Sequence, residues 1–181
     1  MSISINGNGI TSANIADGAI TNADINSSAA IDGTKISGSF GKVLQVVSTT
    51  KTDSWTSSST SFVDVTGLSI SITPTSTTSK ILVRVDSQIG GTADSNHTIQ
   101  LYRTGLGAIG VGSSGGAVCR IYTTYKVDGY PLSYLDSPAT TSSTEYKFQA
   151  RAHTGTVTVN RRNSDTSFQV ASTITLMEIG A

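Results

Sequence analysis

The feature that most constrains this chain is a run of isoleucines spaced five residues apart near its N-terminus. They are Ile5, Ile10, Ile15, Ile20, Ile25, Ile31 and Ile36, with a single six-residue step. A helix repeats about every 3.6 residues and a strand every two, so neither places every fifth residue on one face. Because one large apolar side chain in five buries too little surface to offset the ordering cost, an isolated chain would not hold this segment together. We therefore expect these isoleucines to pack against other copies of the chain.

Three arrangements of residues 1–40 stay open. Three copies could wind around a common axis with the isoleucines pointing inward, which would form a thin stalk and is the arrangement we favour. One chain could instead coil as a short solenoid, since Ala13-Asn14-Ile15 and Ala23-Asp24-Ile25 resemble pentapeptide-repeat units, although so short a segment fills fewer than about two coils. The segment could also stay disordered until it assembles with a partner.

From Val43 onward apolar and polar residues alternate, which is typical of half-buried β-strands. The clearest runs lie at 68–72, 81–86, 99–101, 145–152, 157–159 and 174–176. We expect residues 157–159 to form a hairpin with the preceding strand, because a Thr154-Gly155 turn separates the two. We expect the last strand to be central in its sheet, because so apolar a strand at an edge would promote aggregation.

Turn signals separate these runs and set the number of strands. They lie at Thr73–Ser76, Gly90-Gly91, Gly115-Gly116, Asp128-Gly129 and Ser137-Pro138. This spacing predicts about nine or ten strands, as in a β-sandwich or jelly roll. The expected fold is all-β, with an extended stalk over residues 1–40 and a jelly-roll knob over residues 41–181, assembled as a homotrimer.

Charge and hydropathy exclude several partners. Twelve Lys and Arg balance twelve Asp and Glu, so we expect no binding to nucleic acid. No polybasic or long apolar segment is present, so we expect no insertion into a membrane. The first ten residues, MSISINGNGI, lack the basic and apolar regions of a signal peptide, which indicates synthesis in a cytoplasm.

We expect no catalytic residue, metal or cofactor. The stretch Gly105–Gly110 matches G-x-G-x-x-G, but the residues that follow it would not start the helix that a dinucleotide site needs. His97 and His153, each expected at a surface or interface, lack the spacing of zinc ligands. Asp128 and Asp136 are the one carboxylate pair that we would name for a glycosidase, and loop capping explains both.

Two groups of residues are candidates for surface binding. Tyr122, Tyr125, Tyr130 and Tyr134 surround an Asp-Gly turn, and tyrosine offers rigid contact area with a hydroxyl group for sugar or protein surfaces. Arg161 and Arg162 begin a polar loop and could grip phosphate or carboxylate with two hydrogen bonds. The alternatives are core or trimer-interface tyrosines and a solvated loop tip.

Several long stretches carry a family resemblance. They are GKVLQVVSTTKTDSW, FVDVTGLSISITPTSTTSKILVRV, LYRTGLGAIGVG, SYLDSPATTSSTEYKFQAR and STITLMEIGA. Together they make residues 41–181 similar to the C-terminal knob of bacteriophage virion fibre proteins, many from viruses of marine bacteria and cyanobacteria. The preceding ITSANIADGAITNADINSSAAIDGTKIS resembles the linkers before such knobs. The resemblance implies a jelly roll like that of tumour necrosis factor or complement heads, assembled as a trimer and without a transferable catalytic site.

The expected function follows from the stalk pattern and this resemblance. The chain is expected to be a short trimeric fibre of the virion, attached through its N-terminus to capsid or tail proteins. Its knob would contact a glycan or protein of the host surface. The alternative is a capsid decoration or head-fibre protein with a mainly structural role. From another class, a polysaccharide-degrading enzyme is the remaining hypothesis, and the sequence does not distinguish a head location from a tail location.

Overall fold

The computed structural model describes residues 42–112, 115–122 and 124–180. The seven isoleucines of the expected stalk lie outside these residues. The described part is built from strands and loops and contains no helix, and so no helix long and apolar enough to cross a membrane. The strands are β1 (Val43–Lys51), β2 (Trp55–Ser57), β3 (Val63–Ile72), β4 (Lys80–Gly91), β5 (Ser95–Arg103), β6 (Gly107–Ile109), β7 (Ala117–Ile121), β8 (Asp128–Asp136), β9 (Thr144–Ala152), β10 (Val157–Val159) and β11 (Ser172–Ile179).

One sheet is centred on β4. Strand β8 pairs with one edge of β4, while β11 and β10 both pair with its other edge, one after the other. On the far side, β1 pairs with β11 and β2 pairs with β10. The pairs β10–β11 and β1–β2 therefore act as two long strands, each interrupted by a loop.

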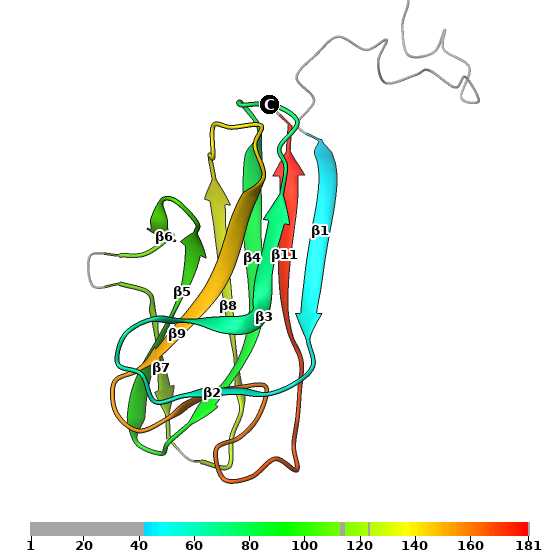
Figure 1. The fold of residues 1–181 in the computed structure, drawn as a ribbon. Helices are drawn as coiled ribbons and strands as arrows, with labels where there is room; N and C mark the ends of the chain where they lie inside the picture. Colours follow the sequence, from blue (N-terminus) through cyan, green and yellow to red (C-terminus); the bar gives the residue numbers. More distant parts are fainter. Residues whose placement is uncertain (1–41, 113–114, 123, 181) are drawn as a thin grey trace, which may run out of the picture. The chain divides into compact units, whose positions relative to one another are not determined.

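The second sheet has the order β3-β9-β5, and β6 and β7 share the free edge of β5. When each interrupted pair is counted once, the described strands reduce to four per sheet, in the orders β8-β4-β11-β1 and β3-β9-β5-β6. The chain alternates between the sheets in the manner of a jelly roll. In Figure 1, β4 and β8 lie behind β9, and β1 lies at the right beside β11. The predicted all-β, two-sheet architecture is confirmed.

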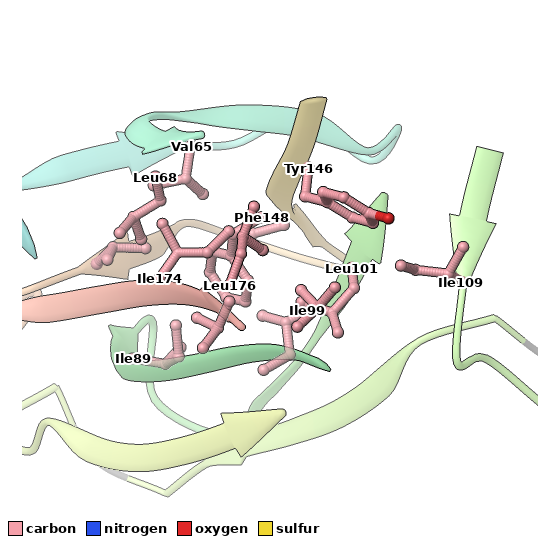
Figure 2. Close-up of a cluster of buried hydrophobic side chains, with 14 of the residues drawn as sticks. Val65, Leu68, Ile89, Ile99, Leu101, Ile109, Tyr146, Phe148, Ile174 and Leu176 are labelled. Carbon is pink, nitrogen blue, oxygen red and sulfur yellow. The ribbon is translucent and has the colours of Figure 1, made fainter. Parts of the chain in front are cut away.

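The core lies between the two sheets. Phe148 of β9 lies beside Ile174 and Leu176 of β11, while Tyr146 of β9 lies toward Leu101 and Ile109 (Figure 2). All of these side chains are buried. Strand β9 alternates strictly between buried and partly exposed residues, as its sequence predicts. The period of two arises because successive side chains of a strand point to opposite faces of the sheet. Strand β11 lies between β1 and β4, so the predicted central position of the last strand is confirmed.

The predicted hairpin over residues 157–159 is wrong. Strand β10 pairs with β4 and β2, whereas β9 belongs to the other sheet. The Thr154-Gly155 turn therefore carries the chain from one sheet to the other. Its Gly155 has a positive φ of 66°, which suits glycine in such a turn.

Two of the predicted turns are strand residues. Gly90 and Gly91 are the last two residues of β4. Glycine is required there because close neighbours leave no room for a side chain: a Cβ at Gly90 would lie 2.5 Å from the carbonyl oxygen of Arg161. A Cβ at Gly91 would collide with the ring of His97. Asp128-Gly129 begins β8 and pairs with the end of β4. Glycine in a strand can mark a close approach of neighbouring groups instead of a turn.

Candidate functional site

The described domain has two distinct ends. At one end β1 begins and β11 finishes, and the amide nitrogen of Gly180 donates to the carbonyl oxygen of Lys42 at 2.9 Å. Strand β4 runs the length of its sheet from this end, where Lys80 pairs with Ile179, to the opposite end, where Gly91 pairs with Val157. Two loops at the opposite end, residues 122 and 124–127 and residues 160–171, are called the distal loops from here on (Figure 1).

Asn160 begins the longer distal loop, and its backbone departs from an ordinary strand. Its φ is +63°, a left-handed conformation in which asparagine is tolerated better than most residues. Its amide nitrogen still donates to the carbonyl oxygen of Gln88 at 2.9 Å, so it continues the pairing with β4. The next residue of the chain then leaves the sheet.

Side-chain bonds of Asn160 close the base of this loop. Its Oδ1 accepts from the hydroxyl of Ser172 at 2.5 Å, which joins the start of the loop to its end. Its Nδ2 donates to the carbonyl oxygens of Lys51 and Asp53 at 2.7 and 3.1 Å, across the interruption between β1 and β2. Sequence reasoning missed Asn160, because two of its partners, Lys51 and Asp53, lie more than a hundred residues away along the chain.

The two distal loops lie against each other. The amide nitrogen of Ser164 donates to the carbonyl oxygen of Thr124 at 3.2 Å. The carbonyl oxygens of Arg161 and Lys126 both lie close to Gly90 of β4, so the two loops share one support. The structure thus brings together two candidate segments, around Tyr122 and around Arg162, that are separated by some forty residues of sequence.

Aromatic rings dominate the surface of these loops. Tyr122, Tyr125 and Phe168 are 73%, 69% and 62% exposed. The guanidinium group of Arg162 lies 4.1 Å from the ring centre of Phe168, and that of Arg120 lies 5.6 Å from the ring centre of Tyr122. These distances are within the range of cation–π attraction. The result is an exposed surface of rings and guanidinium groups, which is suited to contact with sugar rings or protein side chains.

The candidate arginines are engaged within the domain. Arg162 contacts Asp165 through two bonds, Nε to Oδ1 at 2.9 Å and Nη2 to Oδ2 at 2.8 Å. The hydrogen bond from Arg162, followed by one from the backbone of Ser167, lowers the pKa of Asp165 to about 2. Arg161 donates from Nη2 to the hydroxyl of Thr56 at 2.9 Å. The two-pronged grip expected of Arg162 is thus made with a carboxylate of its own loop.

The other two candidate tyrosines, Tyr130 and Tyr134, lie on β8, outside the distal loops. Tyr130 packs partly buried against the core, and its hydroxyl donates to the carbonyl oxygen of Arg120 at 3.3 Å. Tyr134 pairs with Val83, toward the end where β1 begins, and its ring would be 2.9 Å from a Cβ at Gly110. The four tyrosines therefore do not form one surface, and only Tyr122 and Tyr125 belong to the distal loops.

The carboxylates named for a glycosidase stand at opposite ends of β8. Asp128 and Asp136 are its first and last residues, about 26 Å apart at the usual rise of a strand. A glycosidase needs its two carboxylates within about 10 Å. The expectation of loop capping is wrong for Asp136, which is buried in an ion pair with Arg103 at 2.6 Å. Asp128 forms an ion pair with Lys126 at 3.6 Å.

His97 is not at a surface, contrary to expectation. It is fully buried in β5, which lies between β9 and β7. The hydroxyl of Ser95 donates to the carbonyl oxygen of Thr92, so it accepts from Nε2–H of His97 at 2.9 Å. The Nδ1 atom is left without a hydrogen-bond partner among the described residues. Burial, and secondly the nearby His153, lowers the pKa of His97 to about 4.

The remaining predicted motifs carry no chemical site in the described ranges. His153 is exposed, as predicted, and bonds to the hydroxyl of Thr98 at 2.7 Å. No cluster of three metal-ligating side chains occurs among the described residues. The stretch Gly105–Gly110 spans the turn before β6 and β6 itself, with positive φ at Gly105 and Gly107, so it begins no helix.

A hollow of about 350 Å³ lies beside β5 and β8. Apolar side chains, including Leu101, Ile109 and Leu132, and several glycines line it. No described lining residue is charged. The hollow therefore supplies no acid, base or ion for chemistry.

Fold and site define this part of the chain as an all-β, jelly-roll domain with an aromatic surface at one end. No protein-family model matches the chain, and no curated protein matches it by sequence. Among solved structures, a chain from the structure of the infectious bursal disease virus Gx strain is similar, with 11% identity and a TM-score of 0.38. The match covers 84% of this chain and 45% of the viral chain, so this chain spans less than half of that length. A likeness this distant carries no argument about function.

Proposed function

We propose that this protein is a structural component of a bacteriophage virion. It forms a short homotrimeric fibre that is attached through its N-terminal segment to capsid or tail proteins. The jelly-roll domain is the knob of the fibre, and its distal loops contact a glycan or protein of the host surface. The proposed role is adhesive and mechanical, without a chemical step.

The observation that carries this proposal is the polarity of the domain. Strand β1 begins beside the end of β11, while the exposed rings of Tyr122, Tyr125 and Phe168 lie at the opposite end. A domain attached through the residues before Lys42 presents this aromatic surface outward. The fivefold spacing of isoleucines before Lys42 supports a multichain stalk as the attachment, because those side chains need apolar partners from other copies.

The character of the distal loops supports recognition in place of catalysis. Tyrosine and phenylalanine rings provide rigid contact area, and the guanidinium group beside Phe168, that of Arg162, is already paired with Asp165 of the same loop. In the distal loops Arg162 pairs with Asp165, and Lys126 pairs with Asp128 of β8. Arg161 bonds to the hydroxyl of Thr56 and leaves the loops with a small positive excess. This charge favours a neutral or weakly acidic sugar, or a protein surface, over a strongly charged polymer.

Light scattering coupled to size-exclusion chromatography tests the trimer. We expect the molar mass of the eluted full-length protein to be three times the chain mass of 18.7 kDa. A monomer whose circular dichroism and cooperative unfolding show an intact domain would contradict the fibre. Electron microscopy of virions labelled with an antibody against residues 42–180 would then place the knob on the head or the tail, which distinguishes a tail fibre from a capsid decoration.

A further inference from the structure

An apolar row crosses the outer face of the β8-β4-β11-β1 sheet. Direct pairing partners in an antiparallel sheet point to the same side, and Val46 pairs with Met177, Met177 with Leu82, and Leu82 with Leu135. The neighbours of Leu82 along β4 are buried in the core, so the row faces outward. Val46 and Leu135 are 54% and 47% exposed. The four side chains, defined here as the apolar row, therefore form a continuous band across the sheet.

The apolar character is confined to the end where β1 begins. Beside the row, Val43 pairs with Ile179 and adds a second apolar pair. On the other side of the row, the next register positions are Ser48, Thr175, Arg84 and Ser133, all polar. Apart from Lys80, which pairs with Ile179, the outer face is thus mainly apolar next to Lys42 and polar toward the distal loops.

We propose that the apolar row is the surface through which the knobs of neighbouring copies pack around the three-fold axis. The inference rests on the proposed trimer and adds the surface that the copies share. Val43 follows Ile36 by seven residues, and seven residues span at most about 25 Å. If the isoleucines of three copies meet on an axis, each Val43 lies within about that distance of it, and the three apolar rows are gathered there.

The charges around the row permit identical faces to approach. The row contains no charged side chain. Two charged residues of β4 lie next to Leu82 on this face. Arg84 is held by Asp86 through bonds of 2.9 and 3.0 Å, and Lys80 is exposed at the end of the strand, where it pairs with Ile179. Like charges brought together at an interface would oppose association. The Arg84–Asp86 pair cancels its own charge, and Lys80 lies at the end of the sheet, outside the row. An exposed apolar band at such a position is typical of a contact between proteins.

The test compares two substitutions in the full-length chain. Leu135→Glu places a carboxylate in the row, while Leu106→Glu makes the same change at a leucine that is 59% exposed in the β5–β6 turn of the other sheet. We expect Leu135→Glu to raise the dissociation constant of the trimer at least about tenfold in a dilution series, because burying an unpaired charge opposes association. Leu106→Glu should leave the constant unchanged.

A second measurement is needed for the case in which the stalk alone holds the trimer together, so that a substitution in the knob leaves the dissociation constant unchanged. In a Cys119→Ser background, nitroxide labels at Val46→Cys should give shorter distances between copies than labels at Leu106→Cys. Equal distances, with neither glutamate variant weakening a trimeric wild type, would overturn the apolar row as an interface and leave the fibre standing. That outcome would also be expected if residues 1–41 of the same chain covered the row. A monomeric wild type would overturn the fibre and this interface together.

Discussion

Arg103 and Asp136 join the two sheets of the sandwich through an ion pair of 2.6 Å between Nη1 and Oδ2. Arg103 ends β5 and Asp136 ends β8, and their side chains are only 16% and 6% exposed. The hydroxyl of Tyr146 donates to the same Oδ2 at 2.7 Å. Burial, followed by the hydrogen bond to Asp136, raises the pKa of Tyr146. Three polar groups thus satisfy one another at the edge of the core.

Removing one member of this pair should destabilise the domain strongly. Asp136→Asn would leave the guanidinium of Arg103 nearly buried without its counter-charge, which costs about 3 kcal/mol. The free energy of unfolding in urea measures this loss. Asp86→Asn removes the partner of Arg84 in an exposed pair and should cost far less, because water screens both charges. Equal losses in the two variants would contradict the structural role of the buried pair.

Asn160 should stabilise the domain through both its backbone conformation and its side-chain bonds. Asn160→Ala removes the bonds to Lys51, Asp53 and Ser172 and places alanine at a φ of +63°, so we expect a loss of about 3 kcal/mol in the free energy of unfolding. Asn160→Gly removes the same bonds but tolerates the backbone, and it should lose about 1 kcal/mol less. If alanine and glycine cost the same, the left-handed backbone contributes nothing.

Acidification should destabilise the protein through His97. The folded imidazole has its pKa lowered to about 4, whereas an unfolded histidine takes up a proton near pH 6.5. Between these values the unfolded chain binds more protons, so stability falls as the pH drops from 6.5 to 4 and this contribution then levels off. The loss over that window is as much as about 3 kcal/mol.

Urea unfolding between pH 7 and pH 4.5 measures this loss. His97→Gln should flatten the dependence, while His153→Gln, at an exposed histidine, should retain the larger part of it, because burial is the main cause of the lowered pKa of His97 and His153 the smaller one. This pH window excludes the titration of Glu178. Burial by itself would raise the pKa of the Glu178 carboxyl, but hydrogen bonds, first from Gln45, lower that pKa to about 2. Glu178 therefore removes further stability only as the pH falls below about 4.5. A His97→Gln variant with the wild-type pH dependence would show that another group is responsible.

Tyr122 and Tyr125 should contribute to adhesion and little to stability. The double substitution Tyr122→Ala and Tyr125→Ala removes two exposed rings, so we expect the free energy of unfolding to change by less than about 1 kcal/mol. Binding to arrays of bacterial lipopolysaccharides, capsular polysaccharides and outer-membrane proteins should fall at least about tenfold. Tyr134→Ala serves as the matched control and should retain binding, because Tyr134 lies near the end of β8 that is away from the distal loops. Unchanged binding by the double variant would contradict the assignment of the distal loops.

The sequence alone was sufficient for the class of fold and for most strands. Alternation at 81–86 and 145–152 predicted which residues face the core, because the two faces of a strand follow directly from its local geometry. The central position of β11 also followed from its apolar character, since an edge strand of that kind would be hazardous. These features depend only on neighbouring residues of the sequence or on the tendency of an apolar strand to be buried.

Only the tertiary structure decided which segments meet. Strand β10 pairs with β4 instead of its expected partner β9, and His97 of β5 is fully buried instead of lying at a surface or interface. The contact of Ser164 with Thr124 and the bonds of Asn160 join segments whose sequences carry no signal of each other. Strand pairing is a long-range choice, and its energy depends on the packing of the whole sandwich. A local pattern can therefore determine which face of a strand is buried, but not which strand or loop lies beside it.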